Sequence, residues 1–296
     1  MARPPALEGR VCAITGAGRG IGREHALLFA SEGAQLVVND LGAAPDGTGA
    51  DTSAAQAVVD EIGSDAVAHT DDISTWEGAR TLVQTAIDRF GHLDVLINNA
   101  GILRDAFIGS MSEEQWDAVI RVHLKGHFAP LRHAVDHWKA RSKAGEEVKA
   151  AVVNTSSGSG TYLPNPGQAN YGAAKAAIAA LTLVAASELG RHGVRVNGIA
   201  PVARTRLTLA TPGPLGEMFR QEVAAGDLDP FDPKHVSPLV AWLATEDCPL
   251  TGQLFAVQGG SIQPMRGWEL GEPVTTDGDW TIDDIKERIC QPSLSR

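Results

Sequence analysis

Short apolar runs alternate with longer segments of helical periodicity from residue 11 to about residue 260. The runs LVVN, VLIN and AVVN are apolar at most positions, which is typical of parallel strands covered on both faces. We therefore expect an α/β fold with one doubly wound parallel sheet and helices on both faces. The predicted strands are Val11–Thr15, Gln35–Asn39, Ala66–His69, Val95–Asn98, Ala151–Thr155, Arg195–Ile199 and Leu254–Val257, and the predicted helices include Glu24–Ser31, Ala54–Ile62, Ala79–Phe90, Glu113–Val122 and Ala173–Glu188.

Three segments depart from this rhythm, within what we predict to be a single catalytic domain over residues 1–296. Leu41–Thr52 is rich in glycine and proline and predicts a long loop after the second strand. Residues 203–235 carry several prolines, and a segment of that length between two strands predicts a substrate lid. Residues 263–296 contain two tryptophans and a helical pattern at Ile282–Ile289, so we expect an extension that packs on the core or on a neighbouring subunit.

Charge and composition exclude several classes of protein. The net charge of −11 argues against nucleic acid or an anionic membrane as partner, because both require a concentrated basic surface. No uninterrupted apolar run is long enough to cross a bilayer, and the start MARPPALEGR lacks the apolar stretch of a secretory signal, so we expect a cytoplasmic protein. The three cysteines lie far apart, and no histidine belongs to an HExxH pattern, so no metal site is expected.

A glycine-rich turn, TGAGRGIG, follows the first predicted strand and precedes a helix. Such a turn brings the backbone close to a pyrophosphate and aims the free N–H groups of the helix at it, as in a Rossmann-like fold. The predicted contacts are Gly16, Arg19, Gly20, Ile21 and Gly22. By itself the turn could be purely structural; its place between strand and helix favours nucleotide binding.

The residues after the second strand predict the choice of cofactor. Asp40 can accept hydrogen bonds from the adenosine ribose and would repel a 2′-phosphate, and Leu41 follows it where an arginine would favour that phosphate. We therefore expect NAD, with NADP the less favoured alternative, since Arg19 could assist a 2′-phosphate. The competing interpretation is that Asp40 simply begins a turn.

Two further strand ends carry candidate chemistry. Asn99, Ala100 and Gly101 follow the fourth strand, where small residues let the backbone line a cofactor.

Tyr171 and Lys175 share one helix face four residues apart, and an ammonium beside the phenol, together with a nicotinamide, would lower the tyrosine pKa. Ser157, at the end of the fifth strand, could donate to a substrate oxygen. Each motif alone is common and has an ordinary structural interpretation.

Taken in order, TGAGRGIG, NNAG, the strand-end serine and YGAAK resemble the short-chain dehydrogenase/reductase family over residues 9 to 262. VVNDLG, NNAGILRD, VHLKG and GQANY are most similar to 3-hydroxyacyl-CoA dehydrogenases, including the dehydrogenase part of multifunctional β-oxidation enzymes, and to 3-oxoacyl reductases. The resemblance implies dimers or tetramers. It also implies further cofactor contacts from Asp72, Ile73, Val122, Pro201, Val202 and Ala203.

The chain departs from the family pattern at two points. His123 stands where most members have an asparagine that supports a water link to the active-site lysine. We hypothesise that His123 still supports a proton relay, the alternative being a histidine that only fills space. Ser157 precedes Tyr171 by fourteen residues, one more than usual, and we retain Ser157 rather than Ser156 as the catalytic serine.

These observations predict an NAD-dependent dehydrogenase of a secondary alcohol, most simply a 3-hydroxyacyl-CoA or another bulky hydrophobic alcohol. The alternatives are a hydroxysteroid dehydrogenase, an NADP-dependent 3-oxoacyl reductase and a non-catalytic NAD-binding sensor. Arg104, Arg204 and Arg206 could meet a CoA phosphate, or could be solvated.

Overall fold

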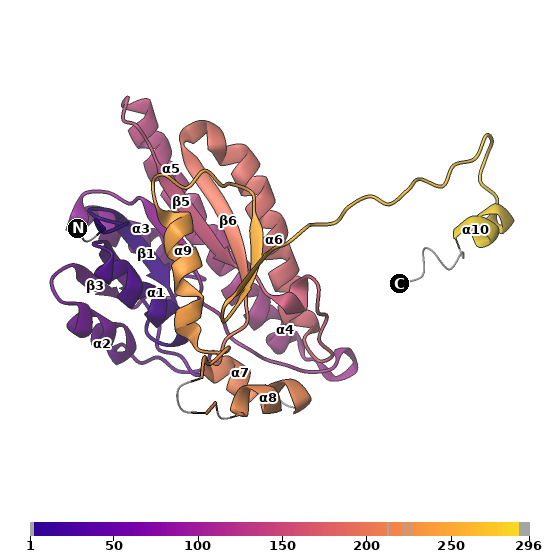
Figure 1. Cartoon of the computed structure of the whole chain (residues 1–296), viewed down its shortest axis with the longest axis horizontal. Coiled ribbons are helices and arrows are strands. Elements are labelled where there is room, and N and C mark those ends of the chain that lie inside the picture. Colours follow the sequence, from indigo (N-terminus) through magenta and orange to yellow (C-terminus); the bar gives the residue numbers. More distant parts are fainter. Residues whose placement is uncertain (1–2, 212, 222, 225–226, 290–296) are drawn as a thin grey trace. The chain divides into compact units, whose positions relative to one another are not determined.

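The computed structural model describes residues 3–211, 213–221, 223–224 and 227–289, in two compact units, Met1–Met265 and Arg266–Arg296. The first unit contains one sheet of eight strands in the order β3-β2-β1-β4-β5-β6-β7-β8 (Figure 1). All neighbouring strands are parallel except β7 and β8. The strands are β1 Val11–Thr15, β2 Gln35–Asn39, β3 Ala66–His69, β4 Val95–Asn98, β5 Ala150–Thr155, β6 Val194–Pro201, β7 Leu254–Gln258 and β8 Ser261–Pro264.

Helices cover both faces of this sheet, as the sequence predicts. They are α1 Gly20–Ser31, α2 Ser53–Ile62, α3 Trp76–Phe90, α4 Glu113–Ile120, α5 Gly126–Lys143, α6 Ala169–Leu189, α7 Arg206–Ala210, α8 Gly213–Arg220 and α9 Ser237–Ala244, with α10 Ile282–Ile289 in the second unit. A π-helical turn, η2, spans Arg121–Lys125 between α4 and α5. The Rossmann-like, doubly wound α/β fold is thereby confirmed.

The near-continuous apolarity of the strands is explained by two cores, one on each face. Cys12 and Ile14 of β1 point into the core that α1, α2 and α9 cover, whereas Val11 and Ala13 point into the core under α3, α5 and α6. Because successive strand residues face opposite sides, a strand buried on both faces must be apolar at every position.

The strand order reverses between β1 and β4. From β1 the chain runs outward through β2 and β3, and then returns to pair β4 with the other side of β1. The loops after these two strands therefore diverge and leave a crevice at their carboxyl ends, which is where doubly wound sheets bind ligands. The predicted glycine turn and the NNAG segment both lie at this switch point.

Most predicted elements match the structure to within a few residues, and the differences have local causes. β8 was not predicted, because its four residues are all exposed and show no apolar pattern. The predicted helix Glu113–Val122 ends as α-helix at Ile120, where η2 begins. The helix predicted at Ile282–Ile289 is confirmed as α10. Its packing on the core or on a neighbouring subunit stays a prediction.

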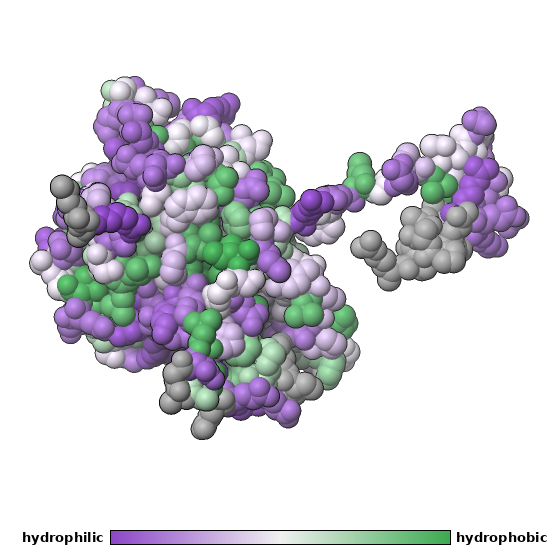
Figure 2. Space-filling model, in the orientation of Figure 1, coloured by the Kyte–Doolittle hydropathy of each residue, from purple (hydrophilic) through white to green (hydrophobic). Residues whose placement is uncertain are grey.

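One helix among the described residues, Ala169–His192, is long and apolar enough for a membrane span by length and composition alone, with 44% of its window buried. The expectation that the chain has no such segment is therefore corrected. That expectation rested on apolar runs, and this stretch is interrupted by the charged residues Lys175, Glu188 and Arg191. Core helices pass the same test, and α6 packs against β6. Figure 2 shows apolar and hydrophilic residues interspersed over the face in view.

The largest fully buried side chain, Trp138 of α5, generates a stability prediction. Its indole N–H donates to the Leu93 carbonyl at 2.6 Å. Trp138→Phe removes that donor and leaves a small cavity, so we expect a loss of about 2–3 kcal/mol in the free energy of unfolding. Urea denaturation measures it, with Trp242→Phe, whose ring is 45% exposed, as control. Equal stability of the two variants would contradict the assignment.

Candidate functional site

A cavity of about 460 Å³ opens at the carboxyl ends of the strands, over the switch point. It gathers residues from the loops after β1, β2, β3, β4, β5 and β6, and from η2 and α6. Residues of the segment after β6, up to Phe219, also line it. The predicted site residues that line it are Gly16, Arg19, Gly20, Ile21, Asp40, Leu41, Asp72, Ile73, Asn99, Ala100, Gly101, Val122, His123, Ser157, Tyr171, Lys175, Pro201, Val202 and Ala203.

The glycine turn forms a cradle suited to a phosphate. Gly16 and Gly20 have φ of +65° and +56°, values that L side chains rarely adopt, and a Cβ on Gly16 would lie 2.7 Å from the Ala100 Cα. Helix α1 begins at Gly20, and within the described residues no side chain caps its first N–H groups. Since Gly20 and Ile21 line the cavity, these donors and the positive end of the helix dipole fit a pyrophosphate.

Gly22 is the exception among the predicted residues, because it does not belong to the cavity wall that the structure describes. A Cβ at this position would lie 2.2 Å from the Gly16 carbonyl oxygen and 2.6 Å from the Asn99 amide nitrogen. Gly22 therefore permits the close packing of α1 against the turn, and its contact with a cofactor stays a prediction.

Asp40 holds the local turn and also stands at the cavity, and its contact with a ribose stays a prediction. Its carboxylate accepts hydrogen bonds from the N–H groups of Gly18 at 2.8 Å and Gly42 at 2.7 Å, so it ties the loop after β2 to the glycine turn. It also lines the cavity. Arg19 forms an ion pair with Asp51 at 3.0 Å, which holds its guanidinium toward the loop.

Asn99 holds the switch point together. Its side-chain N–H group donates to the Thr15 and Gly16 carbonyls, each at 3.1 Å. In return, the Thr15 hydroxyl accepts from the N–H groups of Asn99 at 2.9 Å and Ala100 at 3.1 Å. The ends of β1 and β4 are thus joined by four hydrogen bonds, as the position of the NNAG segment suggested. Thr15 was not among the predicted site residues.

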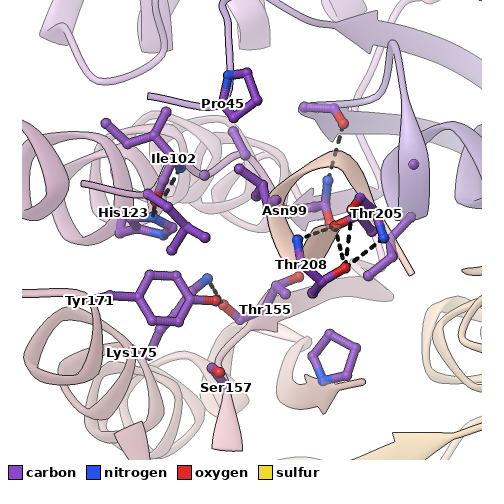
Figure 3. A pocket seen from close by; sticks show the side chains of 18 of the residues that line it. Pro45, Asn99, Ile102, His123, Thr155, Ser157, Tyr171, Lys175, Thr205 and Thr208 are labelled. Carbon is purple, nitrogen blue, oxygen red and sulfur yellow. Dashed lines mark hydrogen bonds between the residues drawn. The ribbon is translucent and has the colours of Figure 1, made fainter. Parts of the chain in front are cut away.

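The predicted serine, tyrosine and lysine meet at one end of the cavity (Figure 3). Tyr171 and Lys175 lie on successive turns of α6, with the lysine nitrogen 5.6 Å from the tyrosine ring centre. Lys175 is 2% exposed, and its Nζ donates to the Thr155 carbonyl at the end of β5 at 2.6 Å. Ser157 lies beside the tyrosine, whose pKa its hydroxyl helps to lower. The arrangement can transfer a proton to or from a small polar group.

Burial dominates the electrostatics of this group. Desolvation raises the pKa of Tyr171 in spite of the hydrogen bond from Ser157, and the Asp105 carboxylate raises it further. Desolvation also lowers the pKa of Lys175 to about 7. The expectation that the neighbouring ammonium lowers the tyrosine pKa is therefore not met by the protein alone, because the site is dry enough to weaken both charged forms.

The two serines differ in their contacts. The hydroxyl of Ser156 is buried and donates to the Lys175 carbonyl at 2.8 Å, a contact that fixes β5 to α6. Ser157 is less buried, and its Oγ accepts from the Ser159 N–H at 3.2 Å. The hydrogen bond of its hydroxyl to Tyr171 favours Ser157 over Ser156 as the catalytic serine, which stays a prediction.

His123 lies on η2 and faces the tyrosine. Its ring packs edge-on against Tyr171 with centres 5.1 Å apart, and its Nε2 lies 2.8 Å from the Ile102 carbonyl and 3.1 Å from the Ile102 N–H (Figure 3). Burial, with a contribution from Lys175, lowers its pKa to about 3, so the ring is neutral. A π-helical turn often marks a functional position in a helix.

Part of the cavity wall is apolar and was only partly anticipated. Its walls include Ile102 and Leu103 from the loop after β4, and Met218 and Phe219 from α8 within the predicted lid. The proline-rich composition pointed to the lid, but nothing in the sequence singled out the loop after β4. Further apolar and aromatic wall residues include Ile73, Tyr162, Leu163 and Leu207.

The three arginines considered for phosphate contacts have different environments. Arg204 is paired with Asp229 at 2.6 Å and donates to the Phe219 carbonyl, so it braces the predicted lid. Arg104 donates to the Asp46 carbonyl at 2.7 Å. Of the three, Arg206 lines the cavity, where burial and the proximity of Arg19 lower its pKa and Asp40 opposes that effect.

Comparison with known proteins gives a consistent result. A family model described as short chain dehydrogenase matches residues 10–209. The hydroxyacyl-CoA dehydrogenase ChsB1 of Mycobacterium tuberculosis is 45% identical over 282 residues, covering 92% of this chain and 84% of that protein. The peroxisomal multifunctional enzyme type 2 of Mus musculus is 42% identical over 303 residues, which cover 98% of this chain but 38% of the larger enzyme.

A solved structure agrees with these relatives. The 3-ketoacyl-(acyl-carrier-protein) reductase of Brucella melitensis, crystallised with NADH, superposes with a TM-score of 0.72 at 31% identity. The match covers 86% of this chain and 98% of the reductase. The predicted similarity to hydroxyacyl-CoA dehydrogenases, multifunctional β-oxidation enzymes and 3-oxoacyl reductases is confirmed.

The buried ammonium of Lys175 generates a prediction for the protein without ligands. Its folded pKa of about 7 lies below the ordinary value of 10.5, so the unfolded chain binds more protons between these pH values. The destabilisation is thus largest below pH 7 and fades as the pH rises toward 10.5. We compare the free energy of unfolding of Lys175→Met with that of the native chain at each pH. The gain of the variant over the native chain should be larger at pH 7 than at pH 9.5, by about 2 kcal/mol.

Chemical denaturation at the two pH values measures this difference, and the constant effect of the lost Thr155 hydrogen bond cancels in it. Lys143→Met, at the exposed end of α5, serves as the matched control and should show no pH-dependent gain. A Lys175→Met effect that is the same at both pH values would contradict the buried-ammonium assignment.

Proposed function

The chain belongs to the short-chain dehydrogenase/reductase family and is an oxidoreductase that acts on CH–OH groups. On that premise, we propose that it oxidises a 3-hydroxyacyl-CoA to the 3-oxoacyl-CoA with NAD. The observation that carries the proposal is the meeting of Ser157, Tyr171 and Lys175 at one end of a cavity whose other end is the glycine cradle. A polar reacting centre and a nucleotide site thus share one space.

In the proposed mechanism, Tyr171 takes the hydroxyl proton of the alcohol, or returns it to the carbonyl in the reverse direction. Ser157 donates its O–H to the same oxygen and stabilises negative charge as it develops there. A nicotinamide held at the glycine cradle would supply the hydride chemistry. Lys175, fixed by Thr155, keeps a cation beside a phenol whose pKa burial has raised. A positive nicotinamide ring would act in the same direction as that cation, favouring the phenolate and lowering the tyrosine pKa.

NAD is supported by the charge of the adenosine end. The Asp40 carboxylate stands in the cavity with its two oxygens fixed by Gly18 and Gly42, so it cannot easily turn away from a 2′-phosphate. Arg19, the basic residue that could offset it, is engaged by Asp51. Asp72 and Ile73 provide the adenine wall in this proposal.

The acyl-CoA substrate is supported by the apolar walls and by the relatives. Ile102, Leu103 and Phe219 offer an apolar surface for an acyl chain, and Arg206 offers a cation at the cavity for a phosphate. One relative is named as a hydroxyacyl-CoA dehydrogenase. We extend the proposal to lipid metabolism, to a homodimer or homotetramer and to a cytoplasmic location.

A second candidate, an NADP-dependent 3-oxoacyl reductase, is favoured by one observation. Arg19 and Arg206 both lie near Asp40 at the cavity, and together they could outweigh its charge at a 2′-phosphate. A non-catalytic NAD sensor is disfavoured, because it would not require the buried lysine and its associated cost.

The role of the tyrosine is directly testable, because the chain has two tyrosines and both line the cavity. We expect Tyr171→Phe to lower kcat for 3-hydroxyacyl-CoA oxidation by about 10³-fold, since the phenol is the proton acceptor, while NADH binding by fluorescence titration is retained. Tyr162→Phe, at the mouth, should change kcat by less than about threefold. Unaltered turnover in Tyr171→Phe would favour the sensor.

Cofactor choice is tested at Asp40. Asp40→Asn keeps the side chain's size and an acceptor oxygen but removes its charge, so we expect the ratio of kcat/KM for NADP to that for NAD to rise by about tenfold or more. Asp46→Asn, in the same loop and exposed, is the matched control. An unchanged ratio, or a native preference for NADP, would overturn the assignment to NAD.

A further inference from the structure

The loop after β4 contacts the first turn of α6, which carries Tyr171. The Arg104 carbonyl accepts from the side-chain N–H group of Asn170 at 3.0 Å, and the side-chain oxygen of Asn170 in turn accepts from the Tyr171 N–H at 2.7 Å. Ile102, from the same loop, belongs to the apolar cluster against which Tyr171 packs. The position of the tyrosine is therefore tied to this loop by both polar and apolar contacts.

Asp105 provides a further tie between the loop and the helix. One of its carboxylate oxygens accepts from the side-chain N–H group of Gln168 at 2.9 Å, and the next residue, Ala106, pairs with Gln168 in an isolated bridge. Gln168 directly precedes α6, is 7% exposed and lines the cavity, as does Tyr171 three residues later. Its side-chain oxygen accepts from the Ser159 hydroxyl at 2.9 Å. Asp105 thus fixes a residue of the cavity wall beside the tyrosine.

The hydrogen bond to Gln168 alone does not explain a carboxylate at this position. The second oxygen of Asp105, Oδ1, is buried and has no hydrogen-bond partner among the described residues. Burial raises the pKa of Asp105, and the bond from Gln168 lowers it. An asparagine would offer Gln168 the same acceptor oxygen without the desolvation of a charge. The charge itself therefore indicates a role beyond holding the loop.

The groups that face Tyr171 carry opposing charges. On α6, the Lys175 ammonium lies 5.6 Å from the ring centre and favours the phenolate. On η2, His123 packs edge-on against the ring and is neutral, because burial lowers its pKa to about 3. Helix α4 contributes apolar side chains to the same cluster. Burial raises the pKa of Tyr171, the Ser157 hydroxyl lowers it, and the Asp105 carboxylate raises it further.

We propose that Asp105 is a positioning residue for Tyr171, which holds Gln168 and the start of α6 in place and sets a negative charge against that of Lys175. The inference rests on the proposed function, in which Tyr171 exchanges a proton with the substrate. Asp105 is not part of the cavity wall that the structure describes, so it acts through its neighbours. With this charge in place, the phenol keeps its proton in the free protein and releases it more readily beside the positive ring of NAD.

The kinetic test separates the charge of Asp105 from its hydrogen bond. Asp105→Asn keeps an oxygen for Gln168 and removes the charge, so we expect the midpoint of the pH dependence of kcat/KM for oxidation to fall by about 0.5–1 unit. Asp105→Ala also removes the oxygen and should lower kcat by about tenfold relative to Asp105→Asn, because the start of α6 loses its tie. Asp117→Asn, an exposed carboxylate on α4, is the matched control and should keep the native profile and kcat.

A measurement without turnover separates this inference from the proposed function. The chain has two tyrosines, so in a Tyr162→Phe background the ultraviolet absorbance of tyrosinate reports Tyr171. Adding Asp105→Asn should lower the pH of half-ionisation by about 0.5–1 unit, and adding Asp117→Asn should not change it. Circular dichroism at each pH checks the fold, and the kinetic midpoint decides if the chain unfolds before the phenol ionises.

The inference is overturned if Asp105→Asn leaves the ionisation of Tyr171 at its native midpoint, or if Asp105→Asn and Asp105→Ala have the same kcat. If the native chain oxidises no hydroxyacyl-CoA yet Asp105→Asn shifts the titration as expected, the proposed function fails and the effect of Asp105 on Tyr171 stands.

Discussion

The hydrogen bond from Lys175 to the Thr155 carbonyl is the contact on which the site depends. It joins the carboxyl end of β5 to the first turns of α6, and so fixes where the face that also carries Tyr171 stands above the sheet. Ser156 reinforces the same junction by donating to the Lys175 carbonyl, which leaves Ser157 as the next residue facing the cavity. A lysine buried to this extent is an unfavourable residue for folding alone, and its retention next to a phenol is explained by chemistry.

The fold could be predicted from the sequence because its main determinants are local. Four of the strands match to the residue, since two-sided burial makes them continuous apolar runs bounded by polar or glycine residues. The site was also largely predictable, because parallel strands end at one edge and the glycine turn, NNAG and the serine each follow such an end. What could not be predicted was long-range in origin. Sequence spacing does not reveal the close packing of Gly22 against the turn, nor the burial that raises the tyrosine pKa.

The site residues that the sequence did not identify belong to no motif and to no periodic pattern. Thr15 closes the switch point through a single hydroxyl, which reads in sequence as an ordinary strand residue. The wall formed by Ile102 and Leu103 lies in an irregular segment without periodicity, and it is held by the Pro45 carbonyl, which accepts from the Leu103 N–H at 2.9 Å. The long loop after β2 therefore supports the cavity near the substrate as well as near the nucleotide.

Cofactor choice and loop stability are linked at Asp40, because one carboxylate serves both. Its hydrogen bonds to Gly18 and Gly42 hold the turn in the shape that accepts a pyrophosphate, and its charge opposes a third phosphate group nearby. A substitution that removes the carboxylate therefore alters the pyrophosphate cradle as well as the charge, and an amide keeps only one of the two accepting oxygens. Arg19 also has two possible partners. Its guanidinium could bind a 2′-phosphate, but it forms an ion pair with Asp51. The preference for NAD or NADP at this end of the cavity thus depends on how the Arg19–Asp51 ion pair and the loop contacts of Asp40 rearrange. The charge of any one side chain matters less than this rearrangement.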